Sequence, residues 1–437
     1  MRVGVVGAGI TGLAVTHYLA ERGVDVVAFE ADDEPGGVIR STRVDGRLLE
    51  HGPQRIRLTP SVAALVDDLD IRGELLEADG ALPLYVYADG ALREVPRSIP
   101  GFLRTDLLSR RSKLRILAEP LTAPARPGER SADLFRRKFG DEAYHNVVEP
   151  LFGGIYGSDP AAMPVEHSLS RLVALQEDGD SLLRVAIEHL RRDDDTPPPV
   201  SFEDGLQALP EALYERHRPY VHLNTPIEAI RDSGDGGRWE LVTGRRSTAV
   251  DTVVVTVPGP AAASLLADVP DATTEPLKDL RYNPLVLVHL HAETDVEGFG
   301  YQVRRGEPLE TLGVTWNDGL FDRDGVHTAF LGGMHDPGVV DRSDSALGDL
   351  ASEEFRAVMG VEPDVLSVTK LPGVLPAHDT SWSALDDVRL PDGVVLATNY
   401  TSRIGVPSRI SEARRLADRL VEDGRDPGDV AIPSRTP

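Results

Sequence analysis

The glycines near the start of the chain have the spacing of a turn that binds a pyrophosphate. Gly7, Gly9 and Gly12 follow an apolar run and lead into a stretch with helical character. The first glycine lets the chain turn sharply, the second lets the backbone approach an anion, and the third lets the helix pack closely on the strand. Unpaired N–H groups in the first helical turn, which begins at Ile10 and Thr11, would face that anion.

An acidic residue occurs where the next strand is predicted to end. Glu30 follows the apolar run 24–29 and precedes Ala31. A carboxylate about 20 residues beyond the glycines can accept hydrogen bonds from a ribose, which favours an adenosine ribose without a 2′-phosphate. The strand, the glycine turn, the helix and the acid occur in the required order. We therefore predict a dinucleotide site that includes the glycine turn, Glu30 and Ala31.

The charge of the chain limits its partners. The 71 acidic and 46 basic residues give a net charge of −25, and only four of the basic residues are lysines. This balance repels nucleic acid. It is typical of a surface that stays hydrated at high salt, where screening reduces self-repulsion. The composition favours a protein from a halophilic archaeon, and an acidic mesophilic protein from a GC-rich genome is the alternative.

Several kinds of site are not predicted. The 437 residues include no cysteine, so disulfides, thiolate metal ligands and cysteine nucleophiles are excluded. His289 and His291 could share one face of a strand, but the sequence offers no third ligand and we predict no metal site. No apolar run reaches the roughly 18 to 20 residues of a membrane-spanning helix. We expect a cytoplasmic protein without an integral membrane segment, as a monomer or homodimer, and a peripheral contact with the inner face of the membrane is the alternative.

Further motifs carry a family resemblance. A Gly36-Gly37 pair follows Glu30, the turn Gly52-Pro53 lies within the segment 49–57, and the segment 149–160 contains a second glycine-rich turn. Near the end of the chain, the segment 390–407 is followed by an amphipathic helical pattern. In this order the motifs resemble the protoporphyrinogen oxidase branch of the flavin amine oxidase superfamily.

The resemblance implies that FAD is bound without a covalent link. The double-glycine loop would wrap the cofactor, and the segment Pro226-Ile227 would contact the adenine. The C-terminal helix would direct its N-terminus towards the flavin, where negative charge develops on reduction. The cofactor-binding residues implied beyond the first glycine turn are Gly36, Gly37, Gly52, Pro53, Gln54, Arg55, Pro226, Ile227, Pro258, Thr398, Asn399, Gly405 and Val406.

The resemblance also implies the oxidation of a porphyrinogen to the porphyrin in haem biosynthesis. The substrate would be protoporphyrinogen IX or coproporphyrinogen III, with hydride transfer to flavin N5 and reoxidation by O2 or another acceptor. Propionate groups require cations, so Arg55 and Arg57 are candidates for binding the substrate. The alternative is that both are surface arginines paired with acids. No residue is assigned to acid–base catalysis.

The sequence departs from the resembled family at a few positions. Thr398 and Arg403 replace motif residues beside the cofactor, and Leu84 falls where some members place an arginine that holds a propionate. One alternative is therefore an amine oxidase or a carotenoid desaturase-like oxidoreductase. Amine oxidases carry a lysine on the strand that matches 285–291, and this segment has none. Another alternative is a flavin-binding paralogue without activity.

From the elements that position these residues we predict an α/β fold for the cofactor domain and an α+β class for the whole chain. A Rossmann-like FAD domain would comprise 1–82, 200–258 and 386–437, and a mixed-sheet substrate domain 83–97 and 259–385. A helical subdomain at 98–192 would be followed by a linker at 193–199. The patterns predict a helix at 59–76, a hairpin at 84–95, a strand at 221–227 and a helix at 343–358. The arginine-rich stretch 98–190 is interpreted as a solvated helical face, with a membrane or partner surface as the alternative.

Overall fold

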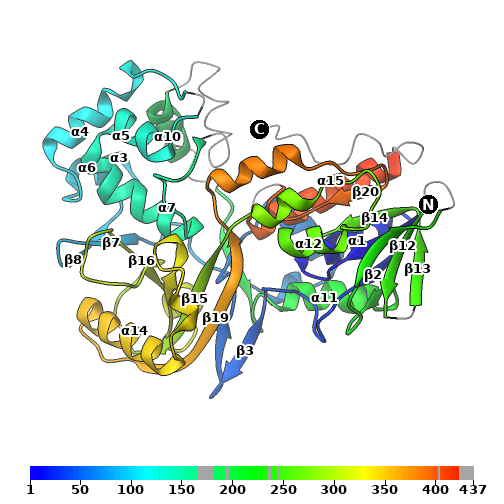
Figure 1. The fold of residues 1–437 in the computed structure, drawn as a ribbon. Coiled ribbons are helices and arrows are strands. Elements are labelled where there is room, and N and C mark those ends of the chain that lie inside the picture. Colours follow the sequence, from blue (N-terminus) through cyan, green and yellow to red (C-terminus); the bar gives the residue numbers. More distant parts are fainter. Residues whose placement is uncertain are drawn as a thin grey trace.

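In the computed structural model, three units together form one elongated molecule (Figure 1). A unit built on a parallel sheet contains the N-terminus, an antiparallel sheet lies beside it, and a group of helices caps the far end of the molecule. The structure describes residues 1–126, 128–165, 181–191, 196–234, 238–244, 246–401 and 404–422.

A five-stranded parallel sheet forms the centre of the first unit, in the order β10-β2-β1-β14-β20. Its strands are β1 (Arg2–Val6), β2 (Asp25–Phe29), β10 (Val221–His222), β14 (Thr252–Val255) and β20 (Val394–Leu396). One face is covered by α1 (Ile10–Glu21), α11 (Ala208–His217) and α15 (Val406–Glu422), and α1 packs on both other helices. The other face carries the antiparallel strands β11 (Ala229–Asp232), β12 (Trp239–Thr243) and β13 (Arg246–Val250), with α12 (Gly259–Leu265).

Both faces of this sheet are apolar, as expected for a parallel sheet covered on each side. Val3 and Val5 face the α1 side and are fully buried. Val253 and Val255 face the other side and pack with Leu241 of β12. The core of the first unit therefore forms two layers, one on each side of the sheet.

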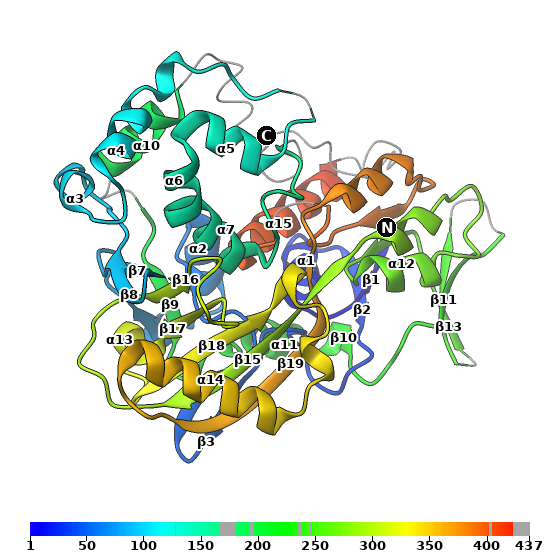
Figure 2. The ribbon, with the colours of Figure 1, turned by 60° about the vertical axis from the view of Figure 1, so that its left-hand side comes forward.

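The second unit is a seven-stranded sheet in the order β19-β15-β18-β17-β16-β7-β8. Only the β16–β7 pairing is parallel. Its strands are β7 (Leu84–Ala88), β8 (Ala91–Glu94), β15 (Tyr282–His291), β16 (Gly300–Val303), β17 (Gly313–Trp316), β18 (Val326–Gly332) and β19 (Asp364–Pro376). The helix α14 (Asp344–Met359) packs on one face, and α13 (Asn317–Phe321) follows β17 (Figure 2).

The described part of the third unit is helical. It comprises α3 (Ile99–Arg104), α4 (Arg110–Leu117), α5 (Ser131–Phe139), α6 (Asp141–Ala143), α7 (Glu149–Tyr156) and α10 (Leu182–Arg191), with a π-helical segment at Tyr144–Val148 and a 3-10 turn at Glu119–Leu121. Val86 and Ala88 of β7 share an apolar cluster with Leu107, Leu108 and Ile116. The helices therefore rest on the hairpin edge of the second sheet. Within the described residues, no helix is long and apolar enough to cross a membrane.

Smaller elements connect the first two units. The hairpin β3 (Ser41–Val44) and β4 (Arg47–Glu50) precedes β5 (Ile56–Arg57) and α2 (Pro60–Asp68). β9 (Pro199–Phe202) lies between β5 and β6 (Leu75–Glu77). This pairing returns the chain to the first unit. Short 3-10 turns lie at Arg72–Glu74, Arg218–Tyr220, Glu275–Asp279, Gly333–His335, Val339–Asp341 and Thr380–Asp387.

Three predicted elements differ in extent from the structure. The helix predicted at 59–76 ends at Asp68 because Asp70 adopts a positive φ of 59°, and the chain continues as β6. The strand predicted at 221–227 has only two residues and is followed by a turn at Asn224, which also has positive φ. The predicted linker 193–199 ends inside β9, since Pro199 is paired with Arg57, and residues 192–195 lie outside the described residues.

Candidate functional site

The glycine turn after β1 has the predicted geometry. Gly7 has a φ of 100°, a conformation that favours glycine. A Cβ on Gly12 would lie 1.9 Å from the carbonyl oxygen of Gly7, so only glycine lets α1 approach the strand this closely. A Cβ on Gly9, the N-cap of α1, would meet nothing within 4 Å. The turn therefore leaves open space over the helix N-terminus, where the N–H groups of Ile10 and Thr11 have no acceptor within the helix.

Glu30 follows β2 and reaches the same turn. One carboxylate oxygen accepts a hydrogen bond from the backbone N–H of Ala8 at 2.6 Å, and the other accepts one from Asp32 at 3.1 Å. The acid is half-buried, whereas Ala31 is exposed. The structure thus brings Glu30 to the glycine turn, as the dinucleotide interpretation requires.

The double-glycine loop folds back onto the first turn. The N–H of Gly36 donates to the carbonyl of Ala8 at 2.8 Å, and a Cβ on Gly37 would lie 3.4 Å from the Cα of Gly9. Both glycines of the pair have positive φ. A Cβ on Gly52 would lie 1.9 Å from the carbonyl oxygen of Val38, so this loop and the Gly52-Pro53 turn pack backbone to backbone.

The central strands end in one row at the carboxyl edge of the parallel sheet. Val6 is paired with both Phe29 and Val255, and Val255 is paired with Leu396. In open parallel sheets this edge is where ligands bind. The residues directly after the row are Gly7, Glu30, Thr256 and Ala397.

Two further predicted cofactor segments lie beside this edge. The loop after β10 is held against Glu30, since the N–H of Thr225 donates to its carbonyl at 2.7 Å. In that loop Pro226 is exposed and Ile227 is half-buried. Pro258 follows β14 and is the N-cap of α12.

In the C-terminal motif, the buried side chain of Arg409 reaches the carboxyl edge of the parallel sheet. The Thr398 side chain is buried, and its carbonyl accepts a hydrogen bond from a terminal nitrogen of Arg409 on α15. Burial lowers the pKa of Arg409 to about 10, and its Nε and Nη2 donors have no partner among the described residues. Buried donors without a hydrogen-bond partner are costly, so Nε and Nη2 fit an anionic or carbonyl group of a bound cofactor.

The rest of the predicted C-terminal motif lies next to this arginine. Asn399 follows Thr398, Gly405 is exposed, and Val406 begins α15 half-buried. Arg403 lies outside the described residues. Arg409 was not predicted, because an arginine in an amphipathic helix usually lies on its solvent face.

Gln54 and Arg55 take different roles. The Gln54 side chain is buried and donates to the carbonyls of Glu50 and Gly52, both at 2.9 Å. Its oxygen accepts a hydrogen bond from Asn317, so the amide holds the shape of the turn and is committed to protein partners. The guanidinium of Arg55 instead lies over the ring of Phe299, 5.0 Å from the centroid.

Arg97, which was not predicted, also lies over the ring of Phe299. Arg97 lies 5.7 Å from the Phe299 centroid and donates to the carbonyl of Leu82 at 2.7 Å. Its position follows from the hairpin, since the N–H of Val95 donates to the carbonyl of Leu84. Arg97 therefore lies beside the start of β7.

None of the three arginines in this region pairs with a carboxylate among the described residues. Arg57 donates to the carbonyl of Pro197 at 2.9 Å, and burial together with Arg97 lowers its pKa. Burial and the neighbouring Arg57 lower the pKa of Arg55 to about 10. The structure therefore does not show Arg55 and Arg57 as surface residues paired with acids.

Buried titratable groups lie behind the Gly52 turn. Burial raises the pKa of Glu50 to about 7, although Ser41 and the Leu206 N–H donate to its carboxylate. His289 is also buried, its Nε2 lies 2.9 Å from the carbonyl oxygen of Glu50, and burial lowers its pKa to about 4. His291 interacts with surface acids instead. Within the described chain no third ligand joins the two histidines.

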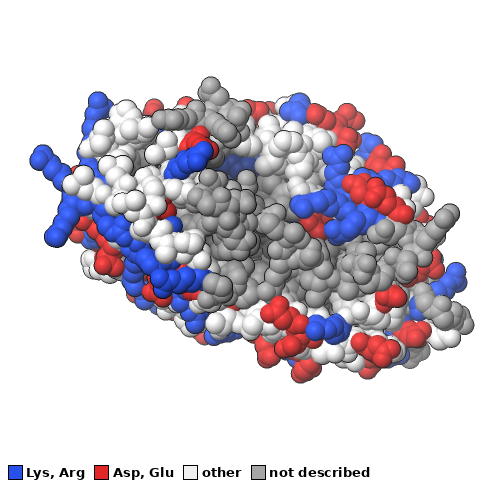
Figure 3. Space-filling view, turned by 90° about the horizontal axis from the view of Figure 1, so that it is seen from above, with Lys and Arg blue, Asp and Glu red and all other residues white. Residues whose placement is uncertain are grey.

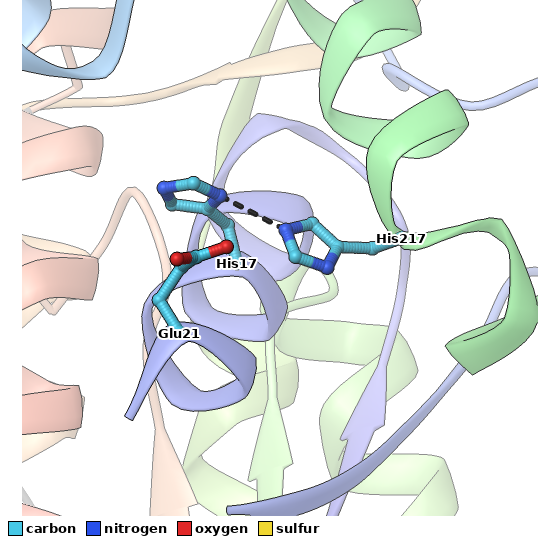
Figure 4. Close-up of side chains that lie close together, drawn as sticks. All are labelled: His17, Glu21 and His217. Carbon is cyan, nitrogen blue, oxygen red and sulfur yellow. Dashed lines mark hydrogen bonds between the residues drawn. The ribbon is translucent and has the colours of Figure 1, made fainter. Parts of the chain in front are cut away.

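A separate histidine cluster joins α1 to α11 (Figure 4). His17 Nδ1 lies 2.9 Å from His217 Nε2, and the carboxylate of Glu21 lies beside them. Burial lowers the pKa of both histidines, that of His217 to about 4. One neutral ring can donate to the other, so the pair links the two helices through a buried hydrogen bond. No sequence pattern indicated this contact between residues 200 positions apart.

Comparisons with known proteins agree with this geometry. Residues 10–421 match the family of flavin containing amine oxidoreductases. The chain is 27% identical to protoporphyrinogen oxidase 1 of Spinacia oleracea, covering 96% of this chain and 84% of that protein. It is 25% identical to coproporphyrinogen III oxidase of Bacillus subtilis, covering 86% of this chain and 87% of that protein.

Solved structures share the fold. A protein from Exiguobacterium sp. 255-15 has a TM-score of 0.80 at 24% identity, covering 97% of this chain and 99% of that one. Putrescine oxidase bound to putrescine has a TM-score of 0.70 at 16% identity, with the same coverage. The open glycine turn, the Glu30 carboxylate beside it and the Arg409 donors that lack a partner among the described residues fit FAD. The chain belongs to the flavin containing amine oxidoreductase family and is an FAD-dependent oxidoreductase.

Proposed function

We propose that this flavoenzyme oxidises a porphyrinogen, either protoporphyrinogen IX or coproporphyrinogen III, to the corresponding porphyrin. The observation that carries the proposal is that the guanidinium groups of Arg55 and Arg97 both lie over the ring of Phe299. Arg55 is three residues beyond Gly52. A porphyrinogen combines a large apolar macrocycle with carboxylate side chains. The two guanidinium groups, which pair with no carboxylate among the described residues, are complementary to the carboxylate side chains.

The chain's own residues bind and orient the cofactor. The N-terminus of α1 would bind the pyrophosphate, Glu30 the ribose, and Arg409 an acceptor group near Thr398. The bound FAD supplies the hydride acceptor, and O2 or another oxidant restores it after each round. The Gly52-Pro53 turn and the double-glycine loop would exclude water from the cofactor, because their backbones are packed against each other.

The substrate would be held by charge. Arg55 and Arg97 would each bind a propionate carboxylate, while the buried ring of Phe299 fixes the two guanidinium groups. Arg57 would add a third positive charge next to Arg55, because its hydrogen bond to a backbone carbonyl does not neutralise it. We assign no residue to proton transfer, so the contribution of the chain is orientation and electrostatics.

Amine oxidation is the second candidate, because putrescine oxidase shares the fold. In amine oxidases a lysine on the strand that matches β15 reaches the flavin through water. β15 has the sequence Tyr-Asn-Pro-Leu-Val-Leu-Val-His-Leu-His and contains no lysine. An unpaired arginine cluster would also repel a cationic amine. Both observations favour the porphyrinogen. A flavin-binding paralogue without activity is the remaining alternative.

Steady-state turnover tests the proposal. The FAD-loaded protein is supplied in air with coproporphyrinogen III, protoporphyrinogen IX or putrescine, and porphyrin fluorescence or aldehyde formation is followed. We expect porphyrin from at least one porphyrinogen at a rate above spontaneous oxidation, and no aldehyde. Aldehyde formation without porphyrin would support the amine oxidase, and neither product would support the inactive paralogue. We place the enzyme in the cytoplasm, as a monomer or homodimer.

A further inference from the structure

The histidine cluster between α1 and α11 has the composition of a metal site (Figure 4). One possible ligand atom each from His17, Glu21 and His217 lies within 4.8 Å of those of the other two residues. Among the described residues, no other group of three or more histidine, cysteine, aspartate or glutamate side chains comes this close together. Two imidazole nitrogens and one carboxylate oxygen are a ligand set that proteins use for zinc.

Two packed helices position these side chains. His17 and Glu21 are four residues apart on α1, so both lie on one face of that helix. His217 is the last residue of α11, which packs on α1. Figure 4 shows the His217 ring and the Glu21 carboxylate converging on the His17 ring. A cation held at this point would therefore join α1 to α11.

The charges around the cluster favour a cation. Burial lowers the pKa of both histidines, so their rings are neutral at neutral pH and their nitrogens can act as ligands. Asp68 Oδ2 lies 3.8 Å from His17 Nε2, which favours the proton on that nitrogen and a lone pair on Nδ1. The opposing charge is Arg216, whose Nη2 lies 3.4 Å from one carboxylate oxygen of Glu21. Two carboxylates thus outweigh one guanidinium.

The distances require only a small adjustment for a metal to bind. His17 Nδ1 and His217 Nε2 are 2.9 Å apart and share one hydrogen atom. Two nitrogens bound to a tetrahedral zinc ion at about 2.0–2.1 Å would be about 3.3 Å apart, so the rings would separate by about 0.4 Å. His217 would then carry its proton on Nδ1. Because Glu21 is exposed, the metal and a water as fourth ligand can enter from its side.

We propose that His17 Nδ1, His217 Nε2 and a carboxylate oxygen of Glu21 bind one zinc ion. The site is structural, since it joins α1 to α11 and has no contact with the proposed substrate residues. The N-terminus of α1 faces the proposed pyrophosphate, so the metal would stabilise the cofactor domain. In the metal-free protein the hydrogen bond between the two rings remains. Zinc binding does not depend on which substrate is oxidised.

Zinc binding to the FAD-loaded full chain, after dialysis against EDTA and then against buffer, tests the site. We expect one zinc ion to bind per chain and the melting temperature to rise, because an ion that binds only the folded state stabilises it. Figure 3 shows exposed acids beside basic side chains on one face of the molecule. Such carboxylates bind Mg²⁺, which prefers oxygen ligands, so Mg²⁺ at the same concentration should not raise the melting temperature as zinc does.

Ligand variants and matched controls locate the metal. Glu21→Gln and His217→Gln should each weaken zinc binding by at least about tenfold. His145→Gln is the control for the histidine, because His145 also lies four residues before an acid, with Nδ1 2.9 Å from Glu149 Oε2. Among the described residues no second histidine joins that pair. Glu215→Gln, at an exposed acid of α11, is the control for the carboxylate. Both controls should bind zinc as the parent does.

The outcomes separate a metal site from a simple hydrogen bond between the rings. Because Glu21 is exposed, Glu21→Gln should keep the flavin content and the zinc-free melting temperature of the parent even if His217→Gln is less stable. The proposal is overturned if zinc leaves the melting temperature of the parent unchanged, or if Mg²⁺ raises it equally. It is also overturned if Glu21→Gln binds zinc as tightly as the parent, or if a control variant weakens binding as much as Glu21→Gln.

Discussion

At the scale of single residues, Arg55 and Arg97 are unusual because they pair with no acid among the described residues, in a chain with a large excess of acids. A partly desolvated guanidinium without a partner costs free energy that a bound carboxylate can recover. Arg55 remains charged at neutral pH, since burial lowers its pKa only to about 10. Both side chains are held by the ring of Phe299, which fixes their positions before a ligand binds.

Arg97→Ala tests the role of this guanidinium in substrate binding. A hydrogen bond to a charged group contributes about 1.5–3 kcal/mol, so we expect KM for the porphyrinogen to rise by roughly 10- to 100-fold. Flavin content and kcat should change little, because Arg97 contacts neither the glycine turn nor the proposed flavin edge. Arg246→Ala is the matched control. An unchanged KM, or a loss of flavin together with activity, would show that Arg97 does not bind substrate.

Glu30→Ala tests the dinucleotide site directly. The change removes the acceptor for the ribose and leaves the N–H of Ala8 without its 2.6 Å hydrogen bond. We expect the free energy of FAD binding to fall by about 1–3 kcal/mol, measured as the flavin that remains after dialysis. Asp32→Ala, at an exposed neighbouring acid, should retain FAD as the parent does. Equal retention by Glu30→Ala and the parent would remove Glu30 from the site.

The residues that the sequence could not reveal are those whose role depends on distant contacts. The glycine turn and Glu30 are recognisable because their spacing is local. Arg97 acquires its role only when Val95 pairs with Leu84 and Phe299 arrives from another strand. Gln54 stays a predicted cofactor residue, and the sequence did not reveal that its amide holds the turn through partners that include Asn317.

At the scale of elements, the same division between local and distant signals holds. The hairpin at 84–95 was predictable because Asp89 and Gly90 favour the positive φ values that they adopt. The helix predicted at 343–358 corresponds to α14, which is capped by Ser343 and ended by Gly360. β19, the 13-residue edge strand, carried no clear local pattern, because its partner β15 lies about 80 residues earlier in the chain.

The helix contact between α1 and α11 predicts a pH dependence of stability. Burial lowers the pKa of His17 and lowers that of His217 to about 4, so both stay neutral in the folded state while the unfolded chain binds protons below about pH 6.5. Stability is therefore lost as pH falls from about 6.5 towards 4. We expect the melting temperature of His217→Gln to fall less between pH 7 and pH 5 than that of the parent. His222→Gln, at an exposed histidine, should follow the parent. A variant curve parallel to the parent's would contradict this account.

At the scale of the whole molecule, the acidic residues greatly outnumber the basic ones along the chain. The 25 excess negative charges repel one another at low ionic strength. In molar KCl the Debye length is only about 3 Å, so this repulsion is screened. We propose on this basis that the protein is halophilic.

The salt dependence of unfolding tests this proposal. The melting temperature should rise steadily between low and molar KCl, measured by circular dichroism on the FAD-loaded protein. KCl is used rather than sodium sulfate because sulfate also strengthens apolar burial, so the effect of charge screening is measured alone. A melting temperature that is flat or falls over this range would contradict the halophilic interpretation and leave an acidic protein of ordinary salt dependence.

The measurement that tests the central claim most directly is anaerobic reduction of the bound flavin. The FAD-loaded protein is mixed without O2 with coproporphyrinogen III, protoporphyrinogen IX or putrescine, and absorbance near 450 nm, approximately the band of oxidised flavin, is followed. We predict rapid bleaching by at least one porphyrinogen, as the flavin removes the first two of the six electrons that separate a porphyrinogen from the porphyrin, and none by the amine. Bleaching by putrescine alone, or by no substrate while FAD is bound, would contradict the assignment.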